Sequence, residues 1–165
     1  MINIKNILVP IDFSENSYQA LDFGFLLASQ NESVIHILHT IENVASLRKY
    51  SLTEERADCE TEECVREEFK RFIEKFPKDE VKIVEAVTMG KAHEQILLYA
   101  RNNKIDIIVI SSHGWTGLTN LITGSVTNKV LRESEIPVLC LKSSAFSGPR
   151  GLFKQKNIQG ENWVG

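Results

Sequence analysis

Small and hydroxyl-bearing residues follow a buried apolar segment near the end of the chain and could bind an anion. Glycine lets a backbone approach a ligand closely, and the first turn of a helix offers N–H groups and a partial positive charge. If a helix begins after Gly124, residues 124–127 form a cradle suited to phosphate. In the alternative, Gly124 only ends a turn and Ser125 only caps a helix. The stretch contains Ser111, Ser112, His113, Gly114, Gly117, Gly124, Ser125, Val126 and Thr127.

Hydrophobic periodicity predicts the elements that position these residues. The first helix is expected to carry an apolar face from Tyr18 to Ala28. Three further helices are expected over about 53–76, 92–103 and 125–133. The expected strands cover 6–10, 33–40, 81–88, 107–110 and 136–141.

Five strands that alternate with four helices indicate an α/β fold with a parallel sheet. Ligands of such open sheets bind beside the carboxyl ends of the strands, where the segment after Ile110 begins. Pro10 is expected to end the first strand, because proline cannot donate to a ladder. Asp12 or Ser14 is expected to cap the helix that follows.

Composition is that of an ordinary globular protein: 165 residues, 42% hydrophobic and 25% charged. With 19 basic and 22 acidic residues the net charge is −3, so no general attraction to nucleic acid or anionic membranes is expected. No run of about 18 apolar residues suggests a membrane span. Cys59, Cys64 and Cys140 contain no CxxC pair, which favours a reducing cytoplasm over a disulfide framework or zinc site.

Two other groups of polar residues have ordinary explanations. His36 and His39 alternate with apolar residues of the second strand and lack further ligands at a recognisable spacing, so we expect core or edge residues. The acidic residues between Glu54 and Glu63 suit an exposed helix start, and a docking surface for a basic partner is the alternative.

The segment SSHGWTGLTNLITGS resembles the nucleotide loop of the universal stress protein family, whose ATP-binding members carry Gly, two residues, Gly, nine residues, then Gly-Ser or Gly-Thr. Gly114 and Gly124 match with nine residues between them, and Ser125 follows. Ser111 departs from the pattern by replacing the first glycine. Val9-Pro10-Ile11-Asp12 also matches the family, and the resemblance spans about residues 5–141.

This resemblance implies strand order 3-2-1-4-5 with helices on both faces, the adenine nucleotide alpha hydrolase-like arrangement. It implies ATP as ligand, with Mg²⁺ bound through the phosphates, and it places Asp12 near the adenine and ribose. The strand end at Thr40 would border the adenine, and the turn at Met89 would form another wall. The implied nucleotide-binding residues are Pro10, Asp12, Ser14, Thr40, Met89, Gly90, Ser111, His113, Gly114, Gly117, Gly124, Ser125, Val126 and Thr127.

The resemblance also implies a homodimer that pairs through the last strand, Pro137 to Leu141. It divides the chain into a domain at 1–142 and a C-terminal tail at 143–165. Such tails are usually mobile, but this one is apolar enough that we expect it to dock. Its large apolar residues are Phe146, Leu152, Phe153, Ile158 and Trp163.

The expected function is therefore that of a nucleotide-controlled dimer in stress response or signalling. No Walker sequence or plausibly placed carboxylate predicts a dedicated enzyme, so ATP hydrolysis is expected to be slow at most. One alternative keeps the fold without nucleotide and acts as a protein-interaction module. A phosphoacceptor receiver domain would need an aspartate at the end of the third strand, where Glu85-Ala-Val-Thr-Met has none. An adenylating enzyme would need a histidine-rich signature after the first strand, which Pro10-Ile-Asp-Phe-Ser lacks.

Overall fold

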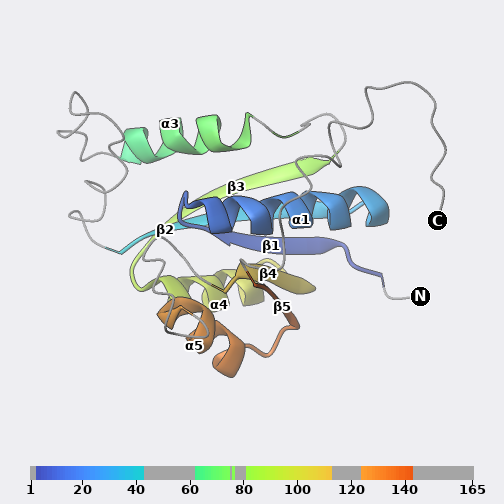
Figure 1. The fold of residues 1–165 in the computed structure, drawn as a ribbon. Coiled ribbons are helices and arrows are strands. Elements are labelled where there is room, and N and C mark those ends of the chain that lie inside the picture. The colour runs from blue at the N-terminus through green and yellow to red at the C-terminus, as the bar shows by residue number, and fades with distance from the viewer. Residues whose placement is uncertain (1–2, 43–61, 75, 77–80, 113–123, 143–165) are drawn as a thin grey trace, which may run out of the picture.

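A computed structural model of the protein describes residues 3–42, 62–74, 76, 81–112 and 124–142 (Figure 1). His113, Gly114 and Gly117 lie outside this part of the chain. The same holds for the first nine residues of the helix expected over 53–76, and for the C-terminal tail from residue 143.

Five parallel strands form one sheet in the order β3-β2-β1-β4-β5, which confirms the expected topology. Within the described residues, no helix is both long and apolar enough to cross a membrane. In chain order the elements are β1 (Asn6–Ile11), α1 (Glu15–Asn31), β2 (Val34–Ile41), α3 (Glu62–Ile73), β3 (Lys82–Met89), α4 (Ala92–Asn102), β4 (Ile107–Ser111), α5 (Ser125–Glu133) and β5 (Val138–Leu141).

Helices cover both faces of the sheet (Figure 1). On one face α1 and α3 pack over the core cluster that contains Phe25 and Phe69. On the other face α4 and α5 pack over a second cluster, which contains Ile96 and Val130. Because neighbouring side chains of a strand point to opposite faces, Leu8 belongs to the second cluster while its neighbours belong to the first.

The first strand does not end at Pro10 as expected, because Pro10 pairs with Leu38 and the strand continues to Ile11. The backbone of β1 alternates: Lys5 O accepts from β2, whereas Asn6 O accepts from the β4 side. The backbone N–H and C=O groups of even-numbered residues therefore point toward β4, and so does the backbone nitrogen of Pro10. The missing N–H is tolerated because pairing between β1 and β4 covers only Ile7 and Leu8 of the first strand.

Backbone pairing between β1 and β4 therefore ends before the carboxyl ends of the two strands. On its other side, β1 remains paired with β2 as far as Ile11 and His39. Strand order also reverses between β1 and β4, and ligands of open α/β sheets bind at this position.

At the amino edge of the sheet, hydrogen bonds from side chains connect neighbouring elements. Asp106 Oδ2 accepts from the backbone N–H groups of Lys5 and Asn6, at 2.7 and 2.8 Å. The buried ring of His36 contacts Tyr99 Oη through Nδ1 at 3.0 Å and Asn6 Oδ1 through Nε2 at 3.4 Å. The amino end of the sheet is therefore closed by side chains from β1, β2 and α4.

Gly24 allows α1 to approach the sheet closely, and we predict that Gly24→Ala destabilises the protein. A Cβ there would lie 2.7 Å from Val9 Cγ2 and 3.1 Å from Ile35 Cδ1, both on buried side chains. Overpacking of this kind costs about 1–3 kcal/mol, which exceeds the gain of up to about 1 kcal/mol in helix propensity. Urea unfolding should show a net loss of stability of about 1 kcal/mol.

The double variant Gly24→Ala/Val9→Ala is the control, because it removes the methyl group that the new Cβ would meet. Gly24→Ala should cost less in the Val9→Ala background than alone, which a double-mutant cycle measures. Equal costs in both backgrounds would contradict this account of the packing.

Candidate functional site

The carboxyl edge of the sheet gathers every candidate site residue that the structure describes. Pro10, Asp12 and Ser14 lie at the end of β1 or in the turn after it, and Thr40 lies near the end of β2. Met89 ends β3 and Gly90 follows it, while Ser111 ends β4. Gly124 is the N-cap of α5, and residues 125–127 form its first turn. His113, Gly114 and Gly117, predicted as part of the same site, lie outside the described residues.

A compact set of hydrogen bonds builds the turn after β1. Ser14 is the N-cap of α1, as expected, and its Oγ accepts from Ser17 N–H at 3.2 Å. Asp12 Oδ1 in turn accepts from Ser14 N–H at 3.1 Å and from Ser14 Oγ at 2.5 Å. The carboxylate of Asp12 therefore orients the cap, and of the two residues expected to cap this helix Ser14 is the one that does so.

Phe13, between these two residues, has a left-handed backbone with φ of 60°. For a residue with a side chain this conformation costs on the order of 1–2 kcal/mol. The half-buried ring contacts His39 at 4.5 Å between centroids, and it meets Phe69 and Phe72 of α3 edge-on at 6.1 and 5.5 Å. Packing of the ring thus compensates for the backbone strain, and sequence reasoning did not identify this residue.

His39 is a core residue that is 1% exposed. Its Nδ1 lies 3.0 Å from the carbonyl oxygen of Ile11, which can only accept, so Nδ1 carries the proton. Burial lowers the pKa of His39, while the hydrogen bond to Ile11 and the charge of Asp12 act in the opposite direction. His39 therefore ties the end of β1 to β2 as a neutral donor.

The ends of β2 and β3 form a second part of the edge. The hydroxyl oxygens of Thr40 and Thr88 lie 3.0 Å apart, so Thr40 has a cross-strand partner that the sequence analysis did not name. Gly90 N–H donates to Ile41 O at 2.9 Å, and Gly90 has φ of 129°, which glycine adopts without strain. Met89 is 70% exposed and presents an apolar side chain beside this turn.

The N-terminus of α5 is fixed to the end of β4 by two hydrogen bonds. Gly124, the N-cap, donates its N–H to Ser112 O at 2.5 Å. Thr127 Oγ1 donates to Ser111 O at 2.8 Å, and both of these residues are buried. Thr127 is one of the residues predicted to bind the nucleotide, and its hydroxyl proton is used to position the helix. The amides of the first turn are therefore the donors that this helix can direct at an anion.

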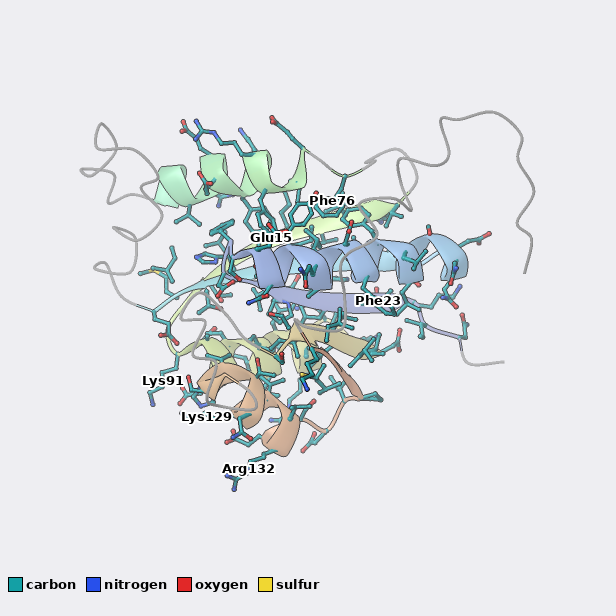
Figure 2. All side chains as sticks on the ribbon, viewed as in Figure 1. Glu15, Phe23, Phe76, Lys91, Lys129 and Arg132 are labelled. Atoms are coloured by element: carbon teal, nitrogen blue, oxygen red, sulfur yellow. The ribbon has the colours of Figure 1, made fainter. Side chains whose placement is uncertain are left out.

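Charged side chains of α4 and α5 lie outside this turn. The side chains of Lys91, Lys129 and Arg132 extend outward on the side of the sheet that α4 and α5 cover (Figure 2). Lys91 is the N-cap of α4, and the other two belong to α5. Lys91 Nζ donates to Glu94 Oε1 at 2.9 Å, and this exposed pair raises the pKa of Lys91. The N-terminus of α4 itself is capped from β2's end, since Ala92 N–H donates to Glu42 Oε1 at 3.0 Å.

Taken together, the carboxylate of Asp12 and the N-terminus of α5 lie at the carboxyl ends of the neighbouring strands β1 and β4. The carboxylate of Asp12 can accept from hydroxyl groups, and the α5 N-terminus can donate to an anion. In the described ranges no group of three or more His, Cys, Asp or Glu side chains could hold a metal ion. The edge is therefore suited to a ligand that carries both hydroxyl groups and an anion.

Residues 3–142 match the Universal stress protein family. Universal stress protein MJ0577 of Methanocaldococcus jannaschii is 31% identical over 156 residues, which cover 84% of this chain and 94% of the relative. A solved structure of MJ0577 superposes with a TM-score of 0.71 at 28% identity, covering 86% of this chain and 97% of the other.

Two solved structures with bound nucleotides share the fold at lower identity. A universal stress protein in complex with cAMP has a TM-score of 0.60 at 20% identity, covering 85% of this chain and 98% of the other. The universal stress protein from Archaeoglobus fulgidus in complex with dAMP has a TM-score of 0.59 at 18% identity, covering 86% of this chain and all of the other.

The buried state of His39 predicts a loss of stability in mild acid. Its pKa is lowered from 6.5 in the folded protein, so unfolding takes up a proton as the pH falls below that value. Stability is fully present above the unfolded pKa and declines from about pH 7 to about pH 5.5, by up to about 1 kcal/mol for this residue. Urea unfolding at both pH values measures the decline.

His39→Gln should make the decline smaller, and His36→Gln should act in the same direction, because burial lowers the pKa of His36 too. The same decline in the wild type and in His39→Gln would show that His39 is not the group that titrates.

Proposed function

The chain belongs to the universal stress protein family, and we propose that it binds an adenine nucleotide and acts in stress response or signalling as a nucleotide-controlled dimer. ATP is the proposed ligand, with Mg²⁺ held by its phosphates and not by protein side chains. The proposed site lies at the carboxyl edge, where the strand order reverses between β1 and β4.

One observation carries the proposal: Asp12 and the N-terminus of α5 lie at the ends of two neighbouring strands, β1 and β4. Asp12 Oδ1 already holds Ser14, so the carboxylate has a fixed position from which to accept ribose hydroxyl groups. The α5 amides are held by the bonds of Gly124 and Thr127 and would donate to phosphate oxygens. A nucleotide has both kinds of group at opposite ends of its sugar.

The proposal of adenine draws on the two structural neighbours described as complexes with cAMP and dAMP. The base would lie at the ends of β2 and β3, beside Thr40 and the exposed side chain of Met89. An apolar side chain that is already exposed can cover one face of a base without further rearrangement.

Ser111, which replaces the first motif glycine, does not argue against this site. It is the last residue of β4 and it is buried. Among the described residues other than glycine, positive φ occurs at Phe13, Glu32 and Lys104. Ser111 therefore occupies a backbone conformation that does not require glycine.

The chain is not proposed to be a dedicated enzyme. Asp12 is assigned to the sugar and to the Ser14 cap, and no other described carboxylate is assigned to orient a water molecule at the phosphates. ATP turnover is therefore expected to be slow. The alternative, a protein-interaction module without nucleotide, is tested by the same titration.

We expect Asp12→Asn to weaken the binding of Mg-ATP and of AMP by at least about tenfold, the loss typical of a hydrogen bond to a charged group. Asparagine keeps an acceptor oxygen for Ser14, so the turn should persist while the charge is lost. Calorimetric titration of both nucleotides into the purified protein measures the change. GTP serves as the comparison for the base.

Asp106→Asn is the matched control, because it removes the same charge at the opposite end of the sheet, and it should leave affinity unchanged. Saturable binding in the wild type and in Asp106→Asn, weakened in Asp12→Asn, supports the site. No heat from either nucleotide at millimolar concentration would instead favour the interaction module.

The proposed dimer uses the open edge of β5. Ile108 N–H donates to Pro137 O, and Ser112 N–H donates to Leu141 O. The backbone groups of odd-numbered residues along β5 therefore face β4. The backbone groups of Val138 and Cys140 consequently face away from the sheet. An edge strand with half-buried apolar side chains is a ready template for pairing with a second copy.

Cys140→Pro should convert the proposed dimer to monomer, because it removes an N–H at the open edge and leaves the β4–β5 bonds intact. Cys140→Val is the control and should remain dimeric. Sedimentation velocity distinguishes the two species. A wild-type monomer, or a Cys140→Pro dimer as stable as the wild type, would place the interface elsewhere or remove it.

A further inference from the structure

We infer that Phe13 couples the proposed nucleotide site to helix α3, so that nucleotide at Asp12 strengthens the docking of α3 and α3 docking raises nucleotide affinity. This inference rests on the proposed function. The coupled element is the left-handed residue Phe13 itself, which shares its peptide bonds with Asp12 and Ser14.

The side chain of Phe13 packs against aromatic rings and against aliphatic core residues. Phe13 lies 4.5 Å from His39 and 5.5 Å from Phe72, measured between centroids. Phe72 continues to Tyr18 at 5.4 Å, and Tyr18 to Phe76 at 4.9 Å. Figure 2 places Phe76 between α3 and α1. Phe13 is the residue of the β1–α1 turn that the described contacts join to α3.

The residues before and after Phe13 form polar hydrogen bonds. Asp12 Oδ1 holds Ser14 N–H and Oγ, and Asp12 N–H donates to Ser17 Oγ at 3.3 Å. These bonds fix the backbone on both sides of Phe13. Two interactions thus stabilise the positive φ of Phe13: the hydrogen bonds of Asp12, and the packing of the Phe13 ring against α3.

Two sites that stabilise one strained residue are linked thermodynamically. A ligand that holds the Asp12 carboxylate in this position favours the left-handed turn, which keeps the Phe13 ring seated against Phe69 and Phe72. By reciprocity, loosening the ring contacts lowers the affinity of the turn for the ligand by the same factor. No contact between ligand and α3 is needed.

Hydrogen–deuterium exchange of the α3 amides, residues 65–73, tests the coupling in the full chain with and without saturating Mg-ATP. The wild type should exchange these amides about fivefold more slowly with nucleotide, a typical size for such coupling. Phe13→Gly keeps φ accessible and removes the ring, so it should bind nucleotide while α3 exchange no longer responds.

Phe72→Ala provides the reciprocal arm and does not depend on the turn variant folding. It should weaken Mg-ATP binding about fivefold without any change at the ligand-contacting residues. Phe76→Ala is the matched control: its ring lies against Tyr18 and Phe25 and is not among the described ring contacts of Phe13, so its removal leaves the Phe13 ring seated and should leave affinity unchanged.

Calorimetric titration of the same preparations separates the two hypotheses. Binding with unchanged α3 exchange, or equal effects of Phe72→Ala and Phe76→Ala on affinity, overturns the coupling and leaves the nucleotide site standing. Absence of binding in the wild type overturns the nucleotide site, and the coupling with it. Slower exchange in the wild type alone, with the affinity loss confined to Phe72→Ala, establishes the coupling.

Discussion

Pro10 cannot donate a hydrogen bond toward β4, and the rest of the carboxyl edge is arranged around this constraint. The nitrogen at this position points to the β4 side, where pairing has already ended two residues earlier. The proline therefore removes no hydrogen bond from the pairing of these two strands. The turn after β1 and the N-terminus of the helix after β4 lie at this same edge of the sheet.

Much of this fold was predictable from local sequence. Apolar runs placed all five strands, Ser14 was one of the two predicted caps of α1, and the start of α5 was predicted correctly. Strand order followed from family resemblance, not from periodicity. The predicted end of β1 was wrong, because whether a proline ends a strand depends on which neighbouring strand its nitrogen faces.

The site was less predictable, because its less obvious residues depend on tertiary contacts. Phe13 follows an ordinary turn sequence, and only the rings of α3 and His39 explain a left-handed aromatic residue there. Thr88 becomes the partner of Thr40 only through the register of β2 and β3. The donation from the Thr127 hydroxyl to the carbonyl of Ser111 likewise depends on how α5 packs against the end of β4. Residue types placed the described candidates at the carboxyl edge, but did not predict their contacts with one another.

The bonds of Asp106 have a consequence for how the chain is made. Its carboxylate accepts from Lys5 and Asn6, and the first of these lies 101 residues earlier. During synthesis β1 can pair with β2 early, but its β4 side stays open until residues beyond Asp106 have left the ribosome. Until then the central strand of the sheet is an edge strand, which exposes the backbone groups of Asn6 and Leu8 to other nascent chains. The last third of the chain is what protects the first strand from aggregation.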